Sequence, residues 1–328
     1  MSRCTETDKP QISILMAVYE PRMDWLREQL LSLDAQTYPN LKLYIRDDCS
    51  PTVSYDAIQS CARDCIRAFS YELRRNEKNL GSNKTFELLT READGEFFAY
   101  CDQDDVWLPE KLEKLHYAIE REKALLACSD MYIIDGDGKQ TADSMAQVRR
   151  HHVFYSGENL SPQLVFHNWV TGCTMLVRST MAKEAIPFCP HMVHDHYLAL
   201  YCADRGKICC IESPLIYYRI HGNNQTGILA GVENKREYLA IRVVSVRKKI
   251  NWLQKHLQQV TPQLEETLRT GAEWVNARES YLQNKRGAAI VWKYRKYGSR
   301  AALFELCSPL LPERLFLCVV NLARKNIL

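Results

Sequence analysis

The feature of this sequence that most restricts its fold is an alternation of apolar runs and helical segments over the first hundred residues. Residues 11–18 are almost continuously apolar, as in a strand that is buried on both faces. Residues 21–37 then place apolar side chains at helical spacing. The succession continues with strands expected at 41–46, 71–74 and 97–101, and helices at 54–69 and 83–91. This order predicts an α/β fold with a doubly wound, mostly parallel sheet.

Acidic residues directly follow two of the expected strands. They are Asp47 and Asp48 after one strand, and Asp102, Asp104 and Asp105 after another. The carboxyl ends of the strands form the ligand crevice of a doubly wound sheet, so we expect these acids to meet there. Crowded carboxylates repel one another unless a cation compensates them, and oxygen ligands suit Mg²⁺ or Mn²⁺. The competing interpretation is a solvated acidic loop that caps the next helix.

The second half of the chain has a different pattern. Strands are expected at 129–134 and 172–178, with a tight turn at 135–138 and a helix at 195–204. From Lys235 onward the pattern becomes helical and basic. We therefore predict a catalytic domain over residues 1–230 and a C-terminal helical appendage over residues 231–328.

The helical region carries an apolar seam at alternating four- and three-residue spacing. The seam consists of Leu239, Val243, Val246, Ile250, Leu253, Leu257 and Val260. It predicts either an internal hairpin with the 264–282 segment or a homodimer interface. The basic residues of the region also suit an anionic membrane surface, and we expect four of them on or near the exposed side: Arg242, Lys248, Lys249 and Lys255.

Composition narrows the classes of protein to be considered. With 46% hydrophobic and 25% charged residues, the 328-residue chain has the balance of a globular protein. A net charge of +3 and the lack of a recognised reading motif argue against nucleic-acid binding. Residues 1–9 lack the apolar core of a signal peptide, and no apolar run approaches the roughly 18–20 residues of a membrane span. The 13 cysteines lack zinc-site spacing, so we expect reduced thiols in a cytoplasmic protein.

Several linked motifs resemble those of one enzyme family. They are residues 12–19 (ISILMAVY), 36–40 (QTYPN), 45–50 (IRDDCS), 79–81 (NLG) and 101–109 (CDQDDVWLP). In order and spacing they resemble the family-two glycosyltransferases of the GT-A fold, from about residue 10 to residue 225. The chain departs from the family pattern at Glu20, where Asn is usual, and at Cys49, where Gly is usual. We expect neither position to carry the chemistry.

The resemblance implies a nucleotide side of the site. Asp48 corresponds to the acid that hydrogen-bonds the base, and Asp102 to the D-x-D acid that contacts ribose or bound water. Ala17 and Tyr19 are assigned to the same side. Asp104 corresponds to the carboxylate that ligates the metal bridging the diphosphate, with Mn²⁺ or Mg²⁺ expected. Such a metal neutralises the charge that develops on a nucleoside diphosphate leaving group.

The resemblance also implies a base and an acceptor side. Asp195 corresponds to the catalytic base before a helix, and a plain helix N-cap is the alternative. His194-Asp195 in place of the usual Glu-Asp is a form associated with the rhamnosyltransferase-like branch. His221, in a Tyr-Arg-x-His-Gly motif, is expected to reach the metal or the diphosphate. Residues assigned to the acceptor or donor-sugar side are Asp105, Trp107, Thr171, Gly172, Cys173 and His194. Plain strand packing is the rival interpretation for the 171–173 segment.

These assignments imply an inverting glycosyltransferase of surface polysaccharide synthesis. The donor implied by the resemblance is dTDP-L-rhamnose, and a UDP-hexose is the alternative. We expect a glycan or lipid-linked saccharide as acceptor, with the protein held peripherally at the inner face of the cell membrane. A nucleotidyltransferase would need a Gly-rich phosphate loop, which residues 18–22 lack. An inactive sugar-nucleotide-binding module is the third class, and retention of Asp48, Asp102, Asp104 and Asp195 argues against it.

Overall fold

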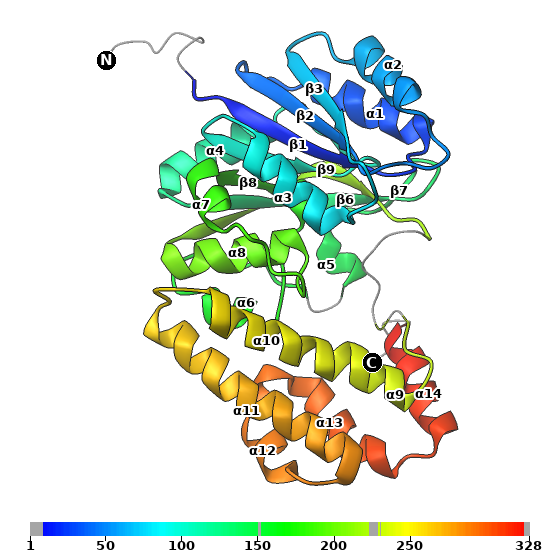
Figure 1. Ribbon diagram of the computed structural model, residues 1–328, viewed down its shortest axis with the longest axis vertical. Coiled ribbons are helices and arrows are strands. Elements are labelled where there is room, and N and C mark those ends of the chain that lie inside the picture. Colours follow the sequence, from blue (N-terminus) through cyan, green and yellow to red (C-terminus); the bar gives the residue numbers. More distant parts are fainter. Residues whose placement is uncertain (1–8, 150–151, 223–228, 230, 325–328) are drawn as a thin grey trace. The chain divides into compact units, whose positions relative to one another are not determined.

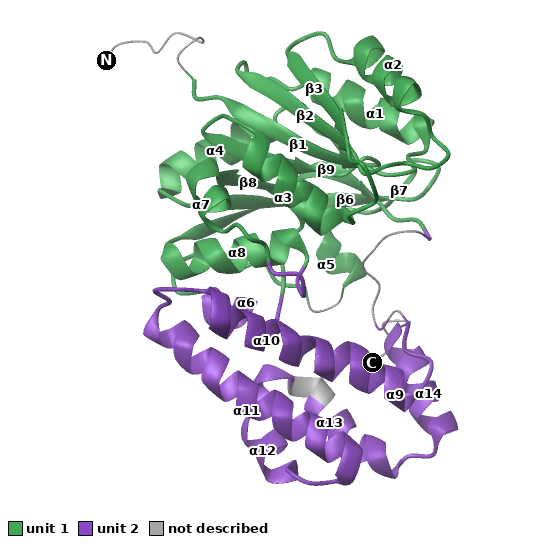
Figure 2. Cartoon of the chain, viewed as in Figure 1, with its two compact units in different colours: residues 1–160, 168–188, 193–221 green, residues 161–167, 189–192, 222–328 purple. Residues whose placement is uncertain are grey.

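The computed structural model describes residues 9–149, 152–222, 229 and 231–324. The chain divides into two compact units (Figure 2). The first comprises Met1–Leu160, Asn168–Phe188 and Val193–His221, and the second comprises Ser161–His167, Cys189–Met192 and Gly222–Leu328. Two short segments that the sequence analysis placed in the first domain therefore belong to the helical unit.

A mixed sheet forms the centre of the first unit, and within the described residues it has nine strands (Figure 1). Their order is β3-β2-β1-β4-β8-β6-β9-β5, with β7 paired to β6. The strands are β1 (Ile12–Val18), β2 (Leu41–Asp47), β3 (Ser70–Arg75), β4 (Phe97–Cys101), β5 (Val106–Trp107), β6 (Leu126–Ile134), β7 (Gln140–Ala142), β8 (Met175–Arg178) and β9 (Ile208–Arg219). The first four strands pair in parallel, as predicted, whereas β8 is antiparallel to both β4 and β6.

Helices cover both faces of the sheet. They are α1 (Met23–Asp34), α2 (Tyr55–Cys65), α3 (Ser82–Glu92) and α4 (Lys111–Glu122), followed later by α5 (Met145–Val148), α7 (Ser179–Glu184) and α8 (His194–Arg205). Side chains alternate across a strand, and Ile14 and Met16 of β1 share one core with α1, α2 and α4. The opposite face, with Leu15, packs against α3. Burial on both faces explains the continuous apolar run of β1, and the doubly wound α/β prediction is confirmed.

Two elements end or begin differently from the sequence expectation. The expected helix 54–69 ends at Cys65, because the Asp34 carboxylate accepts the next backbone N–H groups, those of Arg67 and Ala68. The expected strand 172–178 begins only with β8, because its first three residues form a 3₁₀ turn. In that turn the Gly172 N–H bonds a side chain instead of a neighbouring strand.

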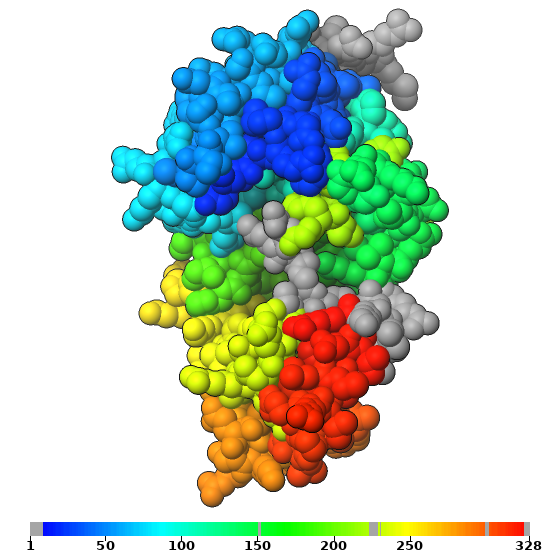
Figure 3. All heavy atoms as spheres, turned by 90° about the vertical axis from the view of Figure 1, so that its right-hand side faces the viewer, coloured from blue at the N-terminus to red at the C-terminus, as the bar shows by residue number. Residues whose placement is uncertain are grey.

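The second unit is built of helices. They are α6 (Ser161–Leu164), α9 (Lys235–Leu239), α10 (Ser245–His256), α11 (Pro262–Asn284), α12 (Ala288–Lys293), α13 (Ser299–Cys307) and α14 (Glu313–Arg324), with a π turn over Ala240–Val244 between α9 and α10. Figure 3 shows α14, in red, at the surface beside the yellow-green start of this helical region. Tyr238 of α9 and Phe316 of α14 share a small core there.

The apolar seam packs inside this unit. Ile250 and Leu253 of α10 are fully buried, and Ile250 lies against Gly271 of α11. The seam therefore forms an internal helical hairpin, one of the two predicted alternatives. The prediction that Lys249 is exposed is wrong, because this side chain is 8% exposed and its Nζ donates to the Val165 carbonyl at 2.5 Å. Burial lowers the pKa of Lys249 to about 8.

Two further expectations concern cysteines and membrane spans. The cysteines of the described residues are all free thiols. Cys128 and Cys210, on neighbouring strands with Sγ atoms 2.9 Å apart, share a hydrogen bond and form no disulfide. Within the described ranges, no helix has both the length and the apolar character that a bilayer crossing requires.

A buried ion pair of the helical unit gives a test of its packing. Arg278 of α11 and Glu305 of α13 are 4% and 1% exposed, and the Arg278 Nε donates to Glu305 at 2.7 Å. Replacing Arg278 by Met leaves the Glu305 charge buried and unpaired, so we expect the free energy of unfolding to fall by about 3–5 kcal/mol. Urea unfolding of the purified variant measures this change.

The matched control is Arg269→Met, which removes an exposed arginine–glutamate pair on the same helix. Exposed pairs contribute about 0–1 kcal/mol, so this variant should unfold almost like the wild type. Equal destabilisation of the two variants would show that the burial of Arg278 has no energetic role.

Candidate active site

The predicted base-binding acid, Asp48, lies just past the end of β2 and is 3% exposed. Its Oδ1 accepts the Leu80 N–H at 2.8 Å and the Asn76 Nδ2–H at 2.7 Å, and its Oδ2 accepts the Gly81 N–H at 2.8 Å. A carboxylate offers about four acceptor positions. Among the described residues three of these positions have a donor, and one position on Oδ2 has none.

The side chain of Gln103 hydrogen-bonds the loop after β1 and so holds it against the D-x-D segment. The sequence analysis did not assign this role to Gln103. Gln103 Oε1 accepts the Tyr19 N–H at 2.8 Å, and its Nε2 donates to the Tyr19 carbonyl at 3.0 Å. The Tyr19 side chain is 44% exposed, and Ala17 is half-buried on β1. These two hydrogen bonds hold the predicted nucleotide side and the predicted metal side together. Because Gln103 binds backbone atoms, nothing in the sequence pattern signals this role.

Glu20 organises the loop that follows Asp48. Its backbone is in the left-handed region, with φ 45°. Its carboxylate accepts the N–H groups of Thr52 and Val53 and the Thr52 hydroxyl. The hydrogen bonds from Thr52 lower the pKa of Glu20. The departure from the family pattern at this position therefore has a structural role beside the site.

Asp102, Asp105 and Cys173 form a cluster in which one potential ligand atom from each lies within 4.8 Å of the others. Asp105 is fully buried, with Oδ1 accepting a backbone N–H of β9 and Oδ2 lacking a hydrogen-bond partner. Burial, followed by the charges of Asp104 and Asp102, raises the pKa of Asp105 well above its usual range. Burial, followed by Asp104 and Asp195, raises the pKa of Asp102 to about 7. Such crowding is typical of a functional site.

The predicted metal ligands Asp104 and His221 lie side by side, with Oδ2 and Nε2 2.7 Å apart. Their side chains are 19% and 16% exposed, so the phosphates of a substrate can reach them. A carboxylate and an imidazole fit Mn²⁺ well and Mg²⁺ less well, since Mg²⁺ prefers oxygen ligands alone. The donor set therefore fits a divalent ion. The cluster of Asp102, Asp105 and Cys173 offers a second, more buried set.

Arg219 holds the backbone of the D-x-D segment, a role that the sequence analysis did not assign to it. The side chain is 1% exposed. Its Nε donates to the Asp104 carbonyl at 2.8 Å, its Nη2 to Glu28 at 2.6 Å and its Nη1 to the Asp135 carbonyl at 3.3 Å. One guanidinium thus joins the Asp104 segment to α1 and to the turn after β6. The available signal was a charged residue continuing the apolar stretch 215–218.

The predicted base, Asp195, is the second residue of α8 and is partly exposed. Its Oδ2 accepts the Gly172 N–H at 2.9 Å, and its Oδ1 accepts the His196 N–H. Burial raises the pKa of Asp195 to about 6, against the lowering effect of those two N–H groups. The N-cap of α8 is Val193, so the alternative that Asp195 is the N-cap is wrong. A carboxylate with this pKa is suited to accept a proton near neutral pH.

The other residues assigned to the acceptor or donor-sugar side differ in exposure. Thr171 is partly exposed at the start of the 3₁₀ turn, in which Gly172 and Cys173 are buried. Trp107 and His194 are 2% and 8% exposed. The His194 ring packs 4.1 Å, centroid to centroid, from a phenylalanine ring of α3. Neither Trp107 nor His194 presents much surface to a ligand in this structure.

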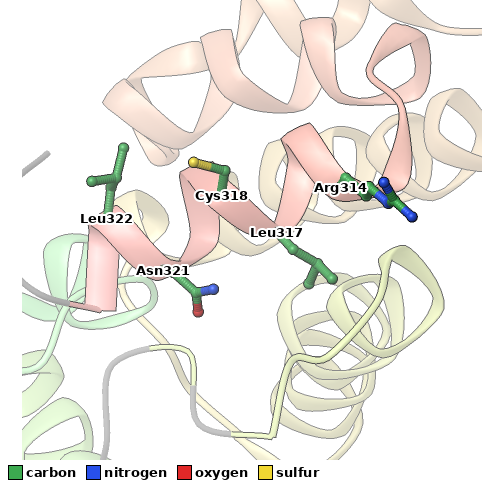
Figure 4. Close-up of a pocket in the computed structure, with 5 residues that line it drawn as sticks. All are labelled: Arg314, Leu317, Cys318, Asn321 and Leu322. Atoms are coloured by element: carbon green, nitrogen blue, oxygen red, sulfur yellow. The ribbon is translucent and has the colours of Figure 1, made fainter.

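The pocket in Figure 4 lies on α14 of the helical unit. Its lining residues are Arg314, Leu317, Cys318, Asn321 and Leu322. None of the predicted site residues is among them. Two leucines, one arginine, one amide and a single thiol offer no carboxylate or imidazole to act as a general base and no set of metal ligands. We therefore do not identify this pocket with the candidate active site.

Comparisons with known proteins agree with the geometry. The family model for glycosyl transferase family 2 matches residues 13–183. The dTDP-rhamnosyl transferase RfbG of Shigella flexneri is 23% identical over 295 residues, which cover 86% of this chain and 94% of that protein. An uncharacterized glycosyltransferase of Nostoc is 27% identical over 241 residues, covering 69% and 70% of the two chains.

Solved structures of low sequence identity share the fold. TarS of Staphylococcus aureus in complex with UDP-GlcNAc has a TM-score of 0.60 at 15% identity, covering 96% of this chain and 92% of that one. A Pyrobaculum calidifontis mannosyltransferase in complex with GDP-Man and Mn²⁺ has a TM-score of 0.55 at 14% identity, covering 92% and 80%. The chain thus has the GT-A fold with additional C-terminal helices, and it belongs to glycosyltransferase family 2.

Proposed function

We propose that the protein is an inverting, metal-assisted transferase that moves a sugar from a nucleotide donor to a saccharide acceptor. The observation that carries this proposal is the turn formed by Gly172 and Cys173. Asp195 binds the N–H of Gly172, and Asp102 and Asp105 cluster with the Cys173 thiol. A proton-accepting carboxylate is therefore joined through two adjacent residues to Asp102 of the D-x-D segment and to the neighbouring Asp105, as transfer at a single reaction centre requires.

The chain's own residues divide the work of this reaction. Asp195 accepts the proton of the acceptor hydroxyl as the oxygen attacks the anomeric carbon, and the bond to the diphosphate breaks on the opposite face. Asp48 uses its open acceptor position for an N–H of the base. Asp104 and His221 would hold Mn²⁺ or Mg²⁺, and the ion would supply charge neutralisation for the departing diphosphate.

For the donor we propose dTDP-L-rhamnose, with a UDP-hexose as the alternative. The match to the dTDP-rhamnosyl transferase RfbG along 94% of its length supports the first choice. The structural likeness to TarS bound to UDP-GlcNAc is why the second is kept. Thymine and uracil both present a single ring N–H, which suits the single open position on Asp48.

For the acceptor we propose a glycan or lipid-linked saccharide of surface polysaccharide synthesis, used at the cytoplasmic face of the membrane. Residues 1–230 would form the catalytic domain and residues 231–328 the part that associates with the membrane surface or with a second subunit. Exposed Arg236, Arg242, Lys248 and Lys255, together with Trp292 at 50% exposure, support the membrane role. A homodimer would need surfaces other than the α10 seam, which is already packed.

A donor panel tests the proposed function directly. Binding stabilises the native state by RT ln(1 + [L]/Kd), so the correct sugar nucleotide should raise the melting temperature most, in the presence of Mn²⁺. We expect dTDP-rhamnose to exceed UDP-hexoses, and mass spectrometry to detect sugar transfer to a saccharide acceptor. Release of pyrophosphate would indicate a nucleotidyltransferase, and binding without any product would indicate an inactive module.

The metal assignment is tested by Asp104→Ala. We expect loss of transfer and loss of the Mn²⁺ dependence of donor binding, because the variant lacks the carboxylate paired with His221. Asp137→Ala, which removes an exposed aspartate in the turn after β6, should leave both properties unchanged. Mn²⁺ dependence that survives Asp104→Ala and disappears in Cys173→Ala would instead place the ion in the buried cluster.

The base assignment predicts a pH dependence. The proton-accepting form of Asp195 is the carboxylate, which is present above its raised pKa of about 6 and is lost as the pH falls through that value. We therefore expect kcat to be level above pH 7 and to fall up to tenfold per pH unit below pH 6. Asp195→Asn should lower kcat by roughly 10²–10⁴ and abolish this acid limb, with donor affinity little changed.

The control for the base variant is Asp204→Asn, which alters another buried aspartate of α8. It should keep the wild-type pH profile. A collapse of donor affinity in Asp195→Asn would reassign Asp195 to the nucleotide side.

The membrane role is tested by vesicle co-sedimentation at low and high salt. Each basic residue near an anionic surface contributes about 1 kcal/mol, screened by salt. We expect the wild type to bind anionic but not neutral vesicles, and Lys248→Glu/Lys255→Glu to bind less. Lys78→Glu/Lys123→Glu makes the same charge change in the first unit and should bind normally. No vesicle binding by the wild type would favour subunit association instead.

A further inference from the structure

We propose that Lys111 is a positioning residue of the reaction, holding the turn that orients Asp195. The inference rests on the proposed transferase function and extends it to a residue outside the family motifs quoted above. Lys111 is the first residue of α4 and is 0% exposed. A lysine is almost never buried to this extent unless its charge has partners.

The partners of Lys111 are a carbonyl and a ring. Its Nζ donates to the Cys173 carbonyl at 2.5 Å and lies 2.9 Å from the centroid of a Trp107 ring. Among the salt bridges of the described residues, none includes Lys111. The ammonium group is therefore committed to one backbone carbonyl and one aromatic face, which fixes its position.

Lys111 donates to the Cys173 carbonyl, which belongs to the same turn as the N–H group that binds Asp195. Cys173 follows Gly172, whose N–H donates to Asp195 Oδ2 at 2.9 Å, and the turn is closed by the Thr174 N–H bond to the Thr171 carbonyl. Lys111 thus anchors the peptide group between Cys173 and Thr174, and the proposed base is bound by the peptide group between Thr171 and Gly172, two peptide groups toward the N-terminus. A displacement of the Cys173 carbonyl would move the Gly172 N–H and with it the carboxylate of Asp195.

The turn has little room to move toward His194 at the start of α8. A Cβ placed on Gly172 would lie 2.7 Å from the His194 Nε2, so the backbone there is already in close contact with the start of α8. The burial of Lys111 lowers the pKa of its ammonium group to about 7.

The contact with Lys111 gives the buried side chain of Trp107 a role in the site. Trp107 follows the D-x-D segment and is 2% exposed. Its backbone N–H is held by the Ser32 hydroxyl at 3.0 Å, which fixes the residue to α1. The ring acts as a platform for the ammonium group of Lys111, so Trp107 contributes to the site from the interior and not as a ligand-facing side chain.

The test replaces Lys111 by Met, which keeps the volume of the side chain but removes the charge and the donor. A buried carbonyl without a partner and a misplacement on the order of 1 Å predict a fall in kcat of about tenfold to a hundredfold. Donor Kd, measured by calorimetry, should change less than about threefold, because Asp48 and the Tyr19 loop are untouched. A loss confined to kcat is a readout that general destabilisation does not give.

The matched control is Lys249→Met. Lys249 is also a buried lysine whose Nζ donates to a backbone carbonyl at 2.5 Å, and it lies in the helical unit. Its variant should lose stability comparably but keep kcat. A second variant, Lys111→Gln, retains an N–H donor without the charge, and its kcat should lie between those of Lys111→Met and the wild type.

Four outcomes would overturn the inference. They are an unchanged kcat in folded Lys111→Met, an equal loss of donor binding, a Gln variant no better than the Met variant, and unfolding of both Lys111 variants where Lys249→Met stays folded. An active wild type with an equally active Lys111→Met variant contradicts the positioning role alone. A wild type that transfers no sugar contradicts the proposed function, and the inference with it.

Discussion

The site depends on balancing charge at the carboxyl edge of a buried sheet. Asp105 is fully buried there and Asp102 is partly exposed, and an isolated buried carboxylate is strongly unfavourable. Two basic side chains, Lys111 and Arg219, are also buried in this unit. Each donates to a backbone carbonyl of a site segment, Lys111 to Cys173 and Arg219 to Asp104. Burial lowers the pKa of Lys111 and the charges of Asp105 and Asp102 in turn act to raise it, whereas the guanidinium of Arg219 is paired with Glu28. Charge balance therefore involves Lys111, and both basic side chains fix the backbone beside the acids.

The parallel half of the fold could be predicted because the position of a strand in the sheet is reflected in its own sequence pattern. β1 is buried on both faces, and its sequence is therefore continuously apolar. The insertion of β8 between β4 and β6 could not be predicted, since it depends on pairing between segments far apart in the sequence, such as Phe97 with Arg178 and Leu126 with Val177. No local pattern records such pairing. The same limit applies to the 3₁₀ turn before β8, whose donor is used by a side chain from another element.

Side chains that bind backbone atoms were the part of the site hidden from sequence reasoning. Gln103, Glu20 and Arg219 all act on N–H or carbonyl groups, which every residue carries. By contrast, Asp104 and His221 were named in advance because motif positions identify them, and the structure places them 2.7 Å apart. The prediction that Lys249 is exposed was wrong for a different reason. Lys249 directly precedes the buried seam residue Ile250, and its Nζ donates to the carbonyl of Val165, a contact with a distant part of the chain that the local pattern does not record.

The division of the chain into units has a consequence for how the protein can be dissected. The segments Ser161–His167 and Cys189–Met192 belong to the helical unit, yet they immediately precede Asn168 and Val193, which flank the Asp195 region. Phe166 stacks on Tyr297, and Val165 accepts a bond from Lys249. A chain cut at residue 230 would leave both segments without their packing partners. The helical unit therefore cannot be separated from the first unit by a single cut of the chain, because a fragment beginning at residue 231 would lack two of the segments that this unit contains.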